Sequence, residues 1–306
     1  MKKLNLVVSL KGMNESYYAR EQATVARRAA EQWGAQVEVL YAEGDPVLQS
    51  QQLLQRIQSR TTPRPDAILV EPVSQLGLPR VAEAAAAAGI AWIVNGARLD
   101  YMPALRSKAK VPVFTVFQHG VGTMLGKQIA ALLPSGGNVL SIQGPTGNPV
   151  ASKRAEYMMM ALPHNIQVKA LRGQLTEASA FQSVTNWLRL SIARADSIDL
   201  VACQVCDLAV GAKKAFKEKS IGAERERWLS LPFLGVGVAG QAKPLVDQGM
   251  LKAAVIIFPT MDRSIELLVR ALERGSQPPE ITVIDEVSYP ALEVLAKKAV
   301  AAAARA

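Results

Sequence analysis

Short apolar runs alternate with amphipathic stretches along almost the whole chain. The first run, Leu4–Leu10, is typical of a buried strand. After a polar turn, apolar residues recur three and four positions apart over Tyr18–Trp33, with Gln22 as one polar member, which predicts a helix. Gly34 follows at the position of a left-handed helix cap, and Val37–Val39 resumes as a strand. Two strands joined by a crossover helix pair in parallel, so the chain opens with a strand–helix–strand unit.

The same alternation continues to the end of the chain. Further strands are expected at 66–72, 90–95, 111–117, 138–143, 166–171, 200–204, 233–238 and 253–258. Further helices are expected from Pro46, at 78–88 and 122–133, from Pro149, from a Thr176 cap through Ile192, at 207–217, at 263–274 and at 289–304. Two halves of this kind, without a Ser- or Gly-rich linker, predict an α/β protein of two lobes, each built on a doubly wound parallel sheet.

Bulk composition agrees with a folded protein of two domains. The chain has 306 residues, of which 49% are hydrophobic and 20% charged. The net charge is +9, which by itself raises the expectation of an acidic partner or nucleic acid. Lys and Arg are nevertheless spread along helices and mixed with Glu, so we interpret the charge as a solvated basic surface and expect no nucleic-acid partner.

The two cysteines, Cys203 and Cys206, form C-x-x-C at a predicted strand end. No disulfide framework is expected from a single pair of this kind. The acidic neighbour Asp207 would raise the pKa of a thiol, so we expect two buried neutral thiols. His119 and His164 do not complete a zinc spacing, and we expect no metal.

Two lysines follow Met1, but the apolar stretch of the first twelve residues is too short for an export signal. No apolar run approaches the roughly 20 residues that a membrane span needs. We therefore expect a cytoplasmic protein if the chain is complete.

Two short segments suggest a family. The turn Asn14–Tyr18 carries an asparagine and two adjacent aromatic residues, and Ile142–Pro145 is a strand and glycine loop followed by Arg154. These segments resemble the Asn-Pro-Phe-Phe turn and the strand, glycine loop and arginine of the type I periplasmic sugar-binding proteins, the ribose-binding-like solute-binding components of ABC transporters. The later landmarks follow in order at Gln204 to Ala212, Gly235 to Gly237 and Asp247 to Leu251. The lactose-repressor family shares this fold but carries a DNA-binding module ahead of it, which we do not expect here.

The resemblance implies two lobes, 1–117 plus 258–284 and 118–257 plus 285–306, that enclose a ligand by hinge closure. The hinge crossings would lie near Gln118, Phe258 and Ile284. The implied function is non-enzymatic and cofactor-free binding of a small carbohydrate-like molecule in the periplasm, with a membrane permease as partner. The alternative is a cytoplasmic sensor whose closure is detected by a regulatory protein.

The resemblance also implies the ligand-binding residues. Tyr17 and Tyr18 would stack on a sugar ring, Asn14 would form a hydrogen bond, and the planar fork of Arg154 would hold hydroxyls or a carboxylate. The alternative for the tyrosines is packing at a helix start, and for Arg154 a charge on a helix surface. The remaining candidates are Arg98, Gln118, Gln204 and Asp207.

This sequence also departs from the family pattern. Asn95–Arg98 replaces an Asp-Arg pair, Val205-Cys206 replaces an Asn-Asp pair, Gly237 replaces an aspartate, and Ile257 replaces a polar hinge residue. A sugar hydroxyl that faces such a gap would lack a hydrogen-bond partner, and each would weaken binding by about 1–3 kcal/mol. We therefore hypothesise a ligand with fewer hydroxyls than a sugar, and an anionic one because of the arginines.

A third alternative is an NAD-dependent oxidoreductase. Gly235–Gly240 fits G-x-G-x-x-G after a strand, with Asp262 further along the chain. Against it, Pro244 interrupts the following helix, and the motif comes late in the chain. Glu71 and Asp207 lie at strand ends and could form an acid–base pair, but no nucleophile accompanies them, so we do not predict catalysis.

Overall fold

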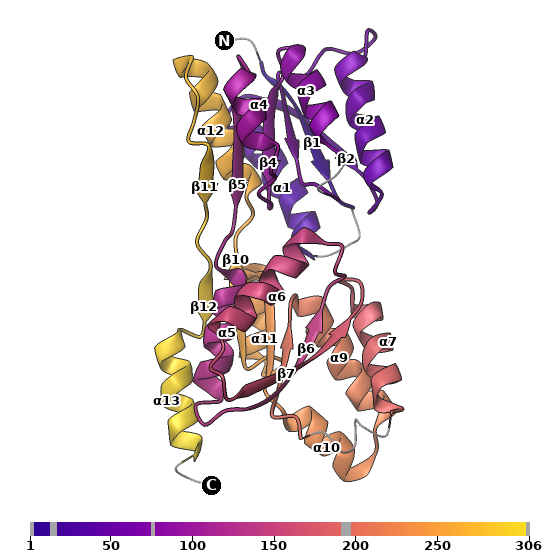
Figure 1. Cartoon of the computed structure of the whole chain (residues 1–306), viewed down its shortest axis with the longest axis vertical. Helices are drawn as coiled ribbons and strands as arrows, with labels where there is room; N and C mark the ends of the chain where they lie inside the picture. Colours follow the sequence, from indigo (N-terminus) through magenta and orange to yellow (C-terminus); the bar gives the residue numbers. More distant parts are fainter. Residues whose placement is uncertain (1–2, 13–16, 75–76, 191–196, 304–306) are drawn as a thin grey trace. The chain divides into compact units, whose positions relative to one another are not determined.

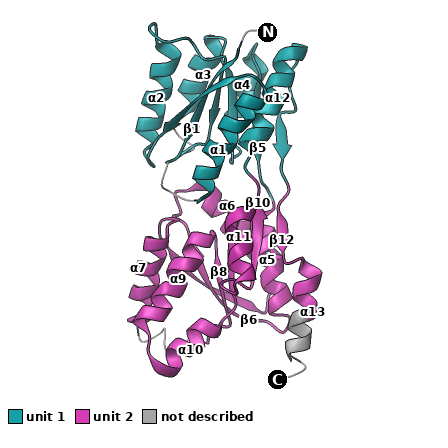
Figure 2. Ribbon diagram, turned by 180° about the vertical axis from the view of Figure 1, so that it is seen from behind, with its two compact units in different colours: residues 1–119, 259–284 teal, residues 120–258, 285–306 magenta. Residues whose placement is uncertain are grey.

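The structure, a computed structural model, describes residues 3–12, 17–74, 77–190 and 197–303, and side chains as far as residue 297 (Figure 1). The chain divides into two compact units, which Figure 2 colours separately. Unit 1 is Met1–His119 with Pro259–Ile284, and unit 2 is Gly120–Phe258 with Asp285–Ala306. The chain therefore passes between the units after His119, after Phe258 and after Ile284.

Unit 1 contains one six-stranded sheet in the order β11-β5-β4-β3-β1-β2. All of its neighbouring strands are parallel. The strands are β1 Asn5–Leu10, β2 Gln36–Tyr41, β3 Ala67–Val70, β4 Ala91–Asn95, β5 Val113–Phe117 and β11 Ile281–Val283. Because β3 and β4 are buried at every position, they consist of continuous apolar residues with a single terminal asparagine.

Helices cover both faces of this sheet. On one face, α1 Tyr17–Gln32 and α12 Met261–Arg274 pack on Leu6, Val8 and Ile93. On the other face lie α2 Pro46–Gln58, α3 Pro79–Ala87 and α4 Met102–Lys108. The amphipathic stripe of α1 explains its position, since its alanines and Val25 are all buried. Unit 1 is thus a three-layer α/β/α domain.

Unit 2 repeats the plan with the strand order β12-β10-β9-β8-β6-β7. Its neighbouring strands are parallel except β10 and β12, which are antiparallel. The strands are β6 Gly137–Gln143, β7 Ile166–Arg172, β8 Leu200–Cys203, β9 Phe233–Val238, β10 Ala253–Ile257 and β12 Val287–Tyr289.

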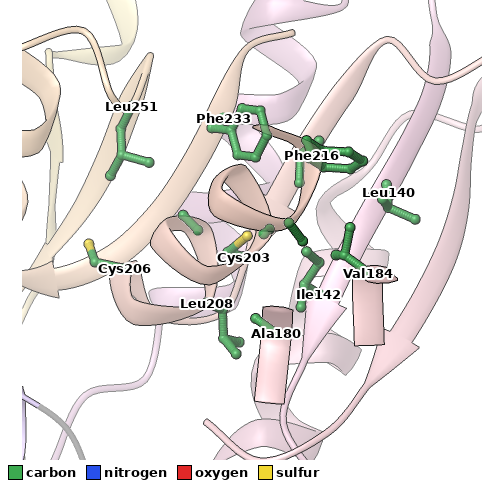
Figure 3. Close-up of a cluster of buried hydrophobic side chains, with 14 of the residues drawn as sticks. Leu140, Ile142, Ala180, Val184, Cys203, Cys206, Leu208, Phe216, Phe233 and Leu251 are labelled. Atoms are coloured by element: carbon green, nitrogen blue, oxygen red, sulfur yellow. The ribbon is translucent and has the colours of Figure 1, made fainter. Parts of the chain in front are cut away.

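The main core of unit 2 lies between its sheet and four helices: α7 Glu177–Leu188, α9 Cys206–Lys219, α10 Gly222–Ser230 and α11 Ala239–Asp247. Figure 3 shows Cys203, Cys206, Phe216 and Phe233 among the aliphatic side chains of this core. Trp228 stacks on Phe216 with ring centroids 4.9 Å apart. The opposite face carries α5 Val121–Leu132, on which α6 Pro149–Ala161 and α13 Leu292–Ala303 pack.

The predicted fold class is confirmed, and most elements lie within two or three residues of their expected bounds. Four elements were not expected: α4, α10, β11 and β12. The last helix was placed too early, because Tyr289 is paired with Ala254 in the sheet and precedes a proline, which disfavours a helical conformation. The sequence offers Asn14 or Ser16 as the cap of the first helix, and both lie outside the described residues, as does Ile192 on the expected face of the helix after Thr176.

Among the residues that the structure describes, no helix is both long enough and apolar enough to cross a membrane.

Candidate functional site

The carboxyl ends of β1, β3, β4 and β5 meet at one edge of the unit 1 sheet, because these strands are parallel. Ligands of open parallel sheets bind at this edge. The residues that directly follow the four strands are Lys11, Glu71, Gly96 and Gln118. We therefore take this edge of unit 1 as a candidate ligand-binding edge.

Both candidate tyrosines lie in the first turn of α1 and are partly buried. The guanidinium carbon of Arg20 lies 5.6 Å from the centroid of the Tyr17 ring. The hydroxyl of Tyr18 accepts a hydrogen bond of 2.9 Å from Nε2 of Gln22, one turn further along the helix. The predicted partner Asn14 lies outside the described residues.

Lys11 and Glu71 form an ion pair at the same edge, with Nζ and Oε1 3.9 Å apart. Their side chains are only 15% and 11% exposed, so the pair is poorly screened by solvent. Gly96 lies beside the pair in a left-handed conformation (φ 78°), and a Cβ at Gly96 would come within 3.9 Å of Oε1 of Glu71. This charged pair stands near the position where the expected Asp-Arg pair is missing. Sequence reasoning did not single out Lys11.

The amide of Gln49 on α2 fixes the loop that carries Glu71. Its Nε2 donates to Oγ of Ser9 (3.0 Å) and to the carbonyl oxygen of Glu71 (2.9 Å), and its Oε1 accepts from the backbone N–H of Val73 (3.0 Å). A neutral amide suits this buried position because it both donates and accepts. The conformation of the loop after β3 is therefore set by α2.

The other unit 1 candidates differ in exposure. Arg98 and its neighbour Asp100 are exposed, and Gln118 is partly buried just before the first passage between units. Asn95 is fully buried at the end of β4. Its Oδ1 accepts from Oγ of Ser264 (2.6 Å), while its Nδ2 has no hydrogen-bond partner in the described part of the chain.

In unit 2, α6 begins at the carboxyl edge of the sheet. Oδ1 of Asn148 caps the helix by accepting from the backbone N–H groups of Val150 (3.0 Å) and Ala151 (3.1 Å). Arg154 lies in the second turn, partly buried, and its Nη1 donates to the carbonyl oxygen of Gln204 at 3.1 Å. The guanidinium group is thus directed toward the end of β8, where a ligand of this edge would lie.

Gln204 itself is 2% exposed, and its side chain is used inside unit 2. Its Oε1 accepts from the backbone N–H of Gly144 (2.9 Å), and its Nε2 donates to the carbonyl oxygen of Ala151 (2.9 Å). These bonds join the loop after β6, the first turn of α6 and the end of β8. Gln204 therefore fixes the relative positions of these three segments.

Asp207 lies in the first turn of α9, where the helix dipole favours a carboxylate. Its Oδ2 accepts a hydrogen bond of 3.0 Å from Nε2 of Gln241. A Cβ at Gly237 would lie 2.9 Å from Oε1 of Gln241 and 2.9 Å from Sγ of Cys206. The space that the expected aspartate would need at Gly237 is therefore occupied, and Gln241 supplies polar atoms there instead. No sequence signal had pointed to Gln241.

Burial accounts for the two thiols. It raises the pKa of Cys203 well above its usual value. Burial and, to a smaller extent, the Asp207 carboxylate raise the pKa of Cys206 to about 12. Both thiols are neutral at physiological pH, as the sequence predicted, and are unsuited to redox exchange or metal binding. Among the described residues, no group of three His, Cys, Asp or Glu side chains could hold a metal ion.

The G-x-G-x-x-G motif does not form a phosphate-binding turn. Gly235 and Gly237 lie inside β9 and are buried against Cys206, while Gly240 is already within α11. Pro244 lies inside α11, as expected. The glycines are explained by close packing, so the geometry gives no support to the oxidoreductase alternative.

The chain forms two α/β units, each with an open and mostly parallel sheet covered by helices, and it passes between them three times. This is the architecture of two-lobe binding proteins. Residues 6–276 match the family described as periplasmic binding protein domain. The chain belongs to this family, which confirms the resemblance seen in the sequence. A comparison with curated protein sequences finds no significant match.

Solved structures of similar fold cover nearly the whole chain. An ABC transporter solute-binding protein from Bacillus halodurans C-125 with bound myo-inositol has a TM-score of 0.77 at 19% identity, over 97% of this chain and 98% of that one. A periplasmic solute-binding protein from Actinobacillus succinogenes 130z with bound D-allose has a TM-score of 0.79 at 20% identity, over 94% and 97%. The fructose-binding periplasmic domain of a hybrid two-component system has a TM-score of 0.77 at 19% identity, over 98% and 95%. At these identities the likeness shows the fold alone.

Proposed function

We propose that this protein is the solute-binding component of an ABC-type uptake system and that it binds a sugar or a cyclic polyol without catalysis. Family membership supports the class, and structures of the same fold with bound myo-inositol and D-allose support the kind of ligand. The single observation that carries the proposal for this chain is the set of polar side chains at the two carboxyl edges. Tyr18 and Asp207 lie in the first turns of α1 and α9, and Arg154 lies in the second turn of α6.

Charge at the edges favours a neutral, hydroxylated ligand. The Lys11 ammonium is already paired with Glu71, and Arg98 is exposed. An anionic ligand would bring a negative charge close to the Glu71 carboxylate. A polyhydroxylated ring instead offers both donors and acceptors to Lys11, Glu71 and Asp207. The hypothesis of a less hydroxylated or anionic ligand stays a prediction, which the same experiment tests.

The experiment is a thermal-shift screen followed by calorimetry. The panel holds myo-inositol, D-allose, L-arabinose, D-fructose and glycerol, with small carboxylic acids and nucleosides as comparison classes. A ligand that binds only the folded state at 100 times its Kd adds about 2.7 kcal/mol to the free energy of unfolding. A shift with a sugar or polyol supports the proposal, while a shift only with acids or nucleosides contradicts the ligand class.

Sensing is the second candidate function, because one structure of similar fold is a domain of a two-component system. Members of the family are named for the periplasm, and we propose that this protein works there. Cross-linking in the native host decides between the roles. Capture of a membrane permease supports uptake, and capture of a kinase or regulator supports sensing.

A further inference from the structure

Gln22 is completely buried in α1 and uses its whole side-chain amide in hydrogen bonds. Nε2 donates to the hydroxyl of Tyr18 (2.9 Å) and to Oγ1 of Thr260 (3.0 Å). Oε1 accepts from the backbone N–H groups of Thr260 (3.0 Å) and Met261 (3.3 Å). One side chain thus joins a candidate ligand residue to a segment 238 residues further along the chain.

The far end of this network is the start of α12. The helix cap residue Thr260 makes no side-chain capping bond of its own. The first N–H groups of a helix have no partner within the helix, and here Oε1 of Gln22 supplies one from α1. Thr260 is also the second residue of unit 1 after the passage that ends unit 2 at Phe258. Residues at such element ends absorb the backbone rotation in hinge motions.

The residue type is demanded by the pattern of donors and acceptors. A carboxylate at position 22 could accept from Thr260 and Met261 but could not donate to the Tyr18 hydroxyl. An apolar side chain would leave buried N–H groups without partners. The single polar residue in the apolar stripe of α1, Gln22, is therefore explained by its hydrogen bonds to Tyr18 and to Thr260.

We propose that Gln22 is a positioning residue that couples the Tyr18 ring to the point where the chain re-enters unit 1, so that ligand contact at Tyr18 and the conformation of Thr260 and Met261 influence each other. The coupling between Tyr18 and Thr260 is a property of unit 1 without ligand. Its consequence for binding rests on the proposed function, since it requires Tyr18 to contact the ligand.

The first arm of the test needs no ligand. 3-Fluorotyrosine is incorporated at Tyr18 in the full chain, and its ¹⁹F resonance is recorded in the wild type and in Thr260→Ala and Gln22→Met variants. We expect both substitutions to move the resonance by more than its linewidth, because each removes a bond of the same amide. Gln128→Met is the matched control: Gln128 is equally buried and donates to the carbonyl oxygen of Ala254 and to Oγ of Ser288 in unit 2. It should leave the Tyr18 resonance in place.

An unmoved resonance in Thr260→Ala would overturn the coupling, even if Gln22→Met failed to fold. A shift of equal size in Gln128→Met would also overturn it, because the effect would then be general destabilisation.

The second arm measures binding of myo-inositol and D-allose by calorimetry. We expect Gln22→Met to weaken the binding of whichever of the two the wild type binds by about tenfold, equal to the loss of one or two net hydrogen bonds. Gln22→Met combined with Tyr18→Phe should be less than additive. Full additivity would make Gln22 a helix cap only and would overturn the proposal. If the wild type binds neither compound, the proposed function fails for these ligands, and the fluorine arm still decides the coupling.

Discussion

The guanidinium group of Arg154 on α6 donates a hydrogen bond to the main-chain carbonyl oxygen of Gln204, 3.1 Å away. The side chain of the same glutamine donates back to the carbonyl oxygen of Ala151 on α6, at 2.9 Å. Each of the two segments, α6 and the end of β8, therefore donates one side-chain hydrogen bond to a main-chain carbonyl oxygen of the other. This hydrogen bond fixes the direction of the Arg154 side chain, and a preoriented guanidinium group would lose less entropy on binding a ligand, so its role in binding stays a prediction.

Replacing Arg154 should abolish ligand binding while the protein still folds. We expect Arg154→Ala to abolish the ligand-induced thermal shift. It should lower the free energy of unfolding of the ligand-free protein by at most about 1.5–3 kcal/mol, the range for a hydrogen bond with a charged donor, because the bond is only partly buried. Differential scanning calorimetry with and without a binding sugar measures both effects. Lys153→Ala is the control, because Lys153 is exposed and its partner Glu156 lies on the same helix. Retained affinity after a large loss of stability would show that Arg154 is structural only.

Removing the cap of α6 should lower both the stability of the protein and its affinity for the ligand. Asn148→Ala removes the acceptor for the N–H groups of Val150 and Ala151, which should cost about 1 kcal/mol of stability. Since α6 carries Arg154, we also expect weaker ligand binding. Asp45→Ala is a close match, because Oδ1 of Asp45 caps α2 in unit 1 through the same pair of N–H positions. Chemical denaturation and calorimetric titration of both variants check the prediction, and equal losses of affinity would contradict it.

The sequence predicted the sheets well because their central strands are buried on both faces and therefore read as uninterrupted apolar runs. β9 was predicted at its observed bounds, Phe233–Val238. β11 and β12 have three residues each, too few to show a period, and both pair only with strands distant in the chain. The helix α10 mixes charged and apolar residues and buries only Trp228, so it gives no clear stripe.

The candidate site was predictable only where a local motif carries it. Tyr17 and Tyr18 lie in the first turn of α1 and Arg154 in the second turn of α6, and each helix follows a segment whose sequence is typical of a turn. Lys11 was missed because its significance depends on Glu71, which follows a different strand. Gln22 appeared only as a polar interruption, because its main partner is Thr260, the residue that precedes α12. Contacts of this kind are set by tertiary packing, which a single sequence does not display.

Gly237 should tolerate no side chain. An added Cβ would meet Sγ of Cys206 and Oε1 of Gln241, each at 2.9 Å, in the packed layer between β9 and α9. We expect Gly237→Ala to destabilise the protein by about 1–3 kcal/mol through overpacking. Gly147→Ala is the control, since nothing lies within 4 Å of its added Cβ. Thermal unfolding compares the midpoints of the two variants, and an equal midpoint for both would contradict overpacking at Gly237.

Close packing of these glycines also predicts that the wild type has no dinucleotide site. Titration of the wild type with NADH should give no fluorescence change, and saturable NADH binding would contradict this explanation of the glycines.

The buried thiols predict how stability changes at alkaline pH. Burial raises the pKa of Cys206 to about 12 in the folded protein, and it raises the pKa of Cys203 well above that of an exposed thiol. The unfolded chain therefore loses thiol protons first, and the stabilisation that is complete below pH 9 is lost as the pH rises toward 12. Each thiol should lower the free energy of unfolding by up to about 1.4 kcal/mol per pH unit in this range.

Urea unfolding at a series of pH values, compared between the wild type and Cys206→Ala, isolates the contribution of Cys206 to this slope. The variant loses some stability at every pH because of the cavity, but its slope between pH 9 and 12 should be shallower than that of the wild type. A thiol reagent such as Ellman's should meanwhile label neither cysteine in the folded protein at pH 8 and both after denaturation. Rapid labelling of the folded protein, or identical slopes, would show that Cys206 ionises within the native structure and that α9 does not seal it from water.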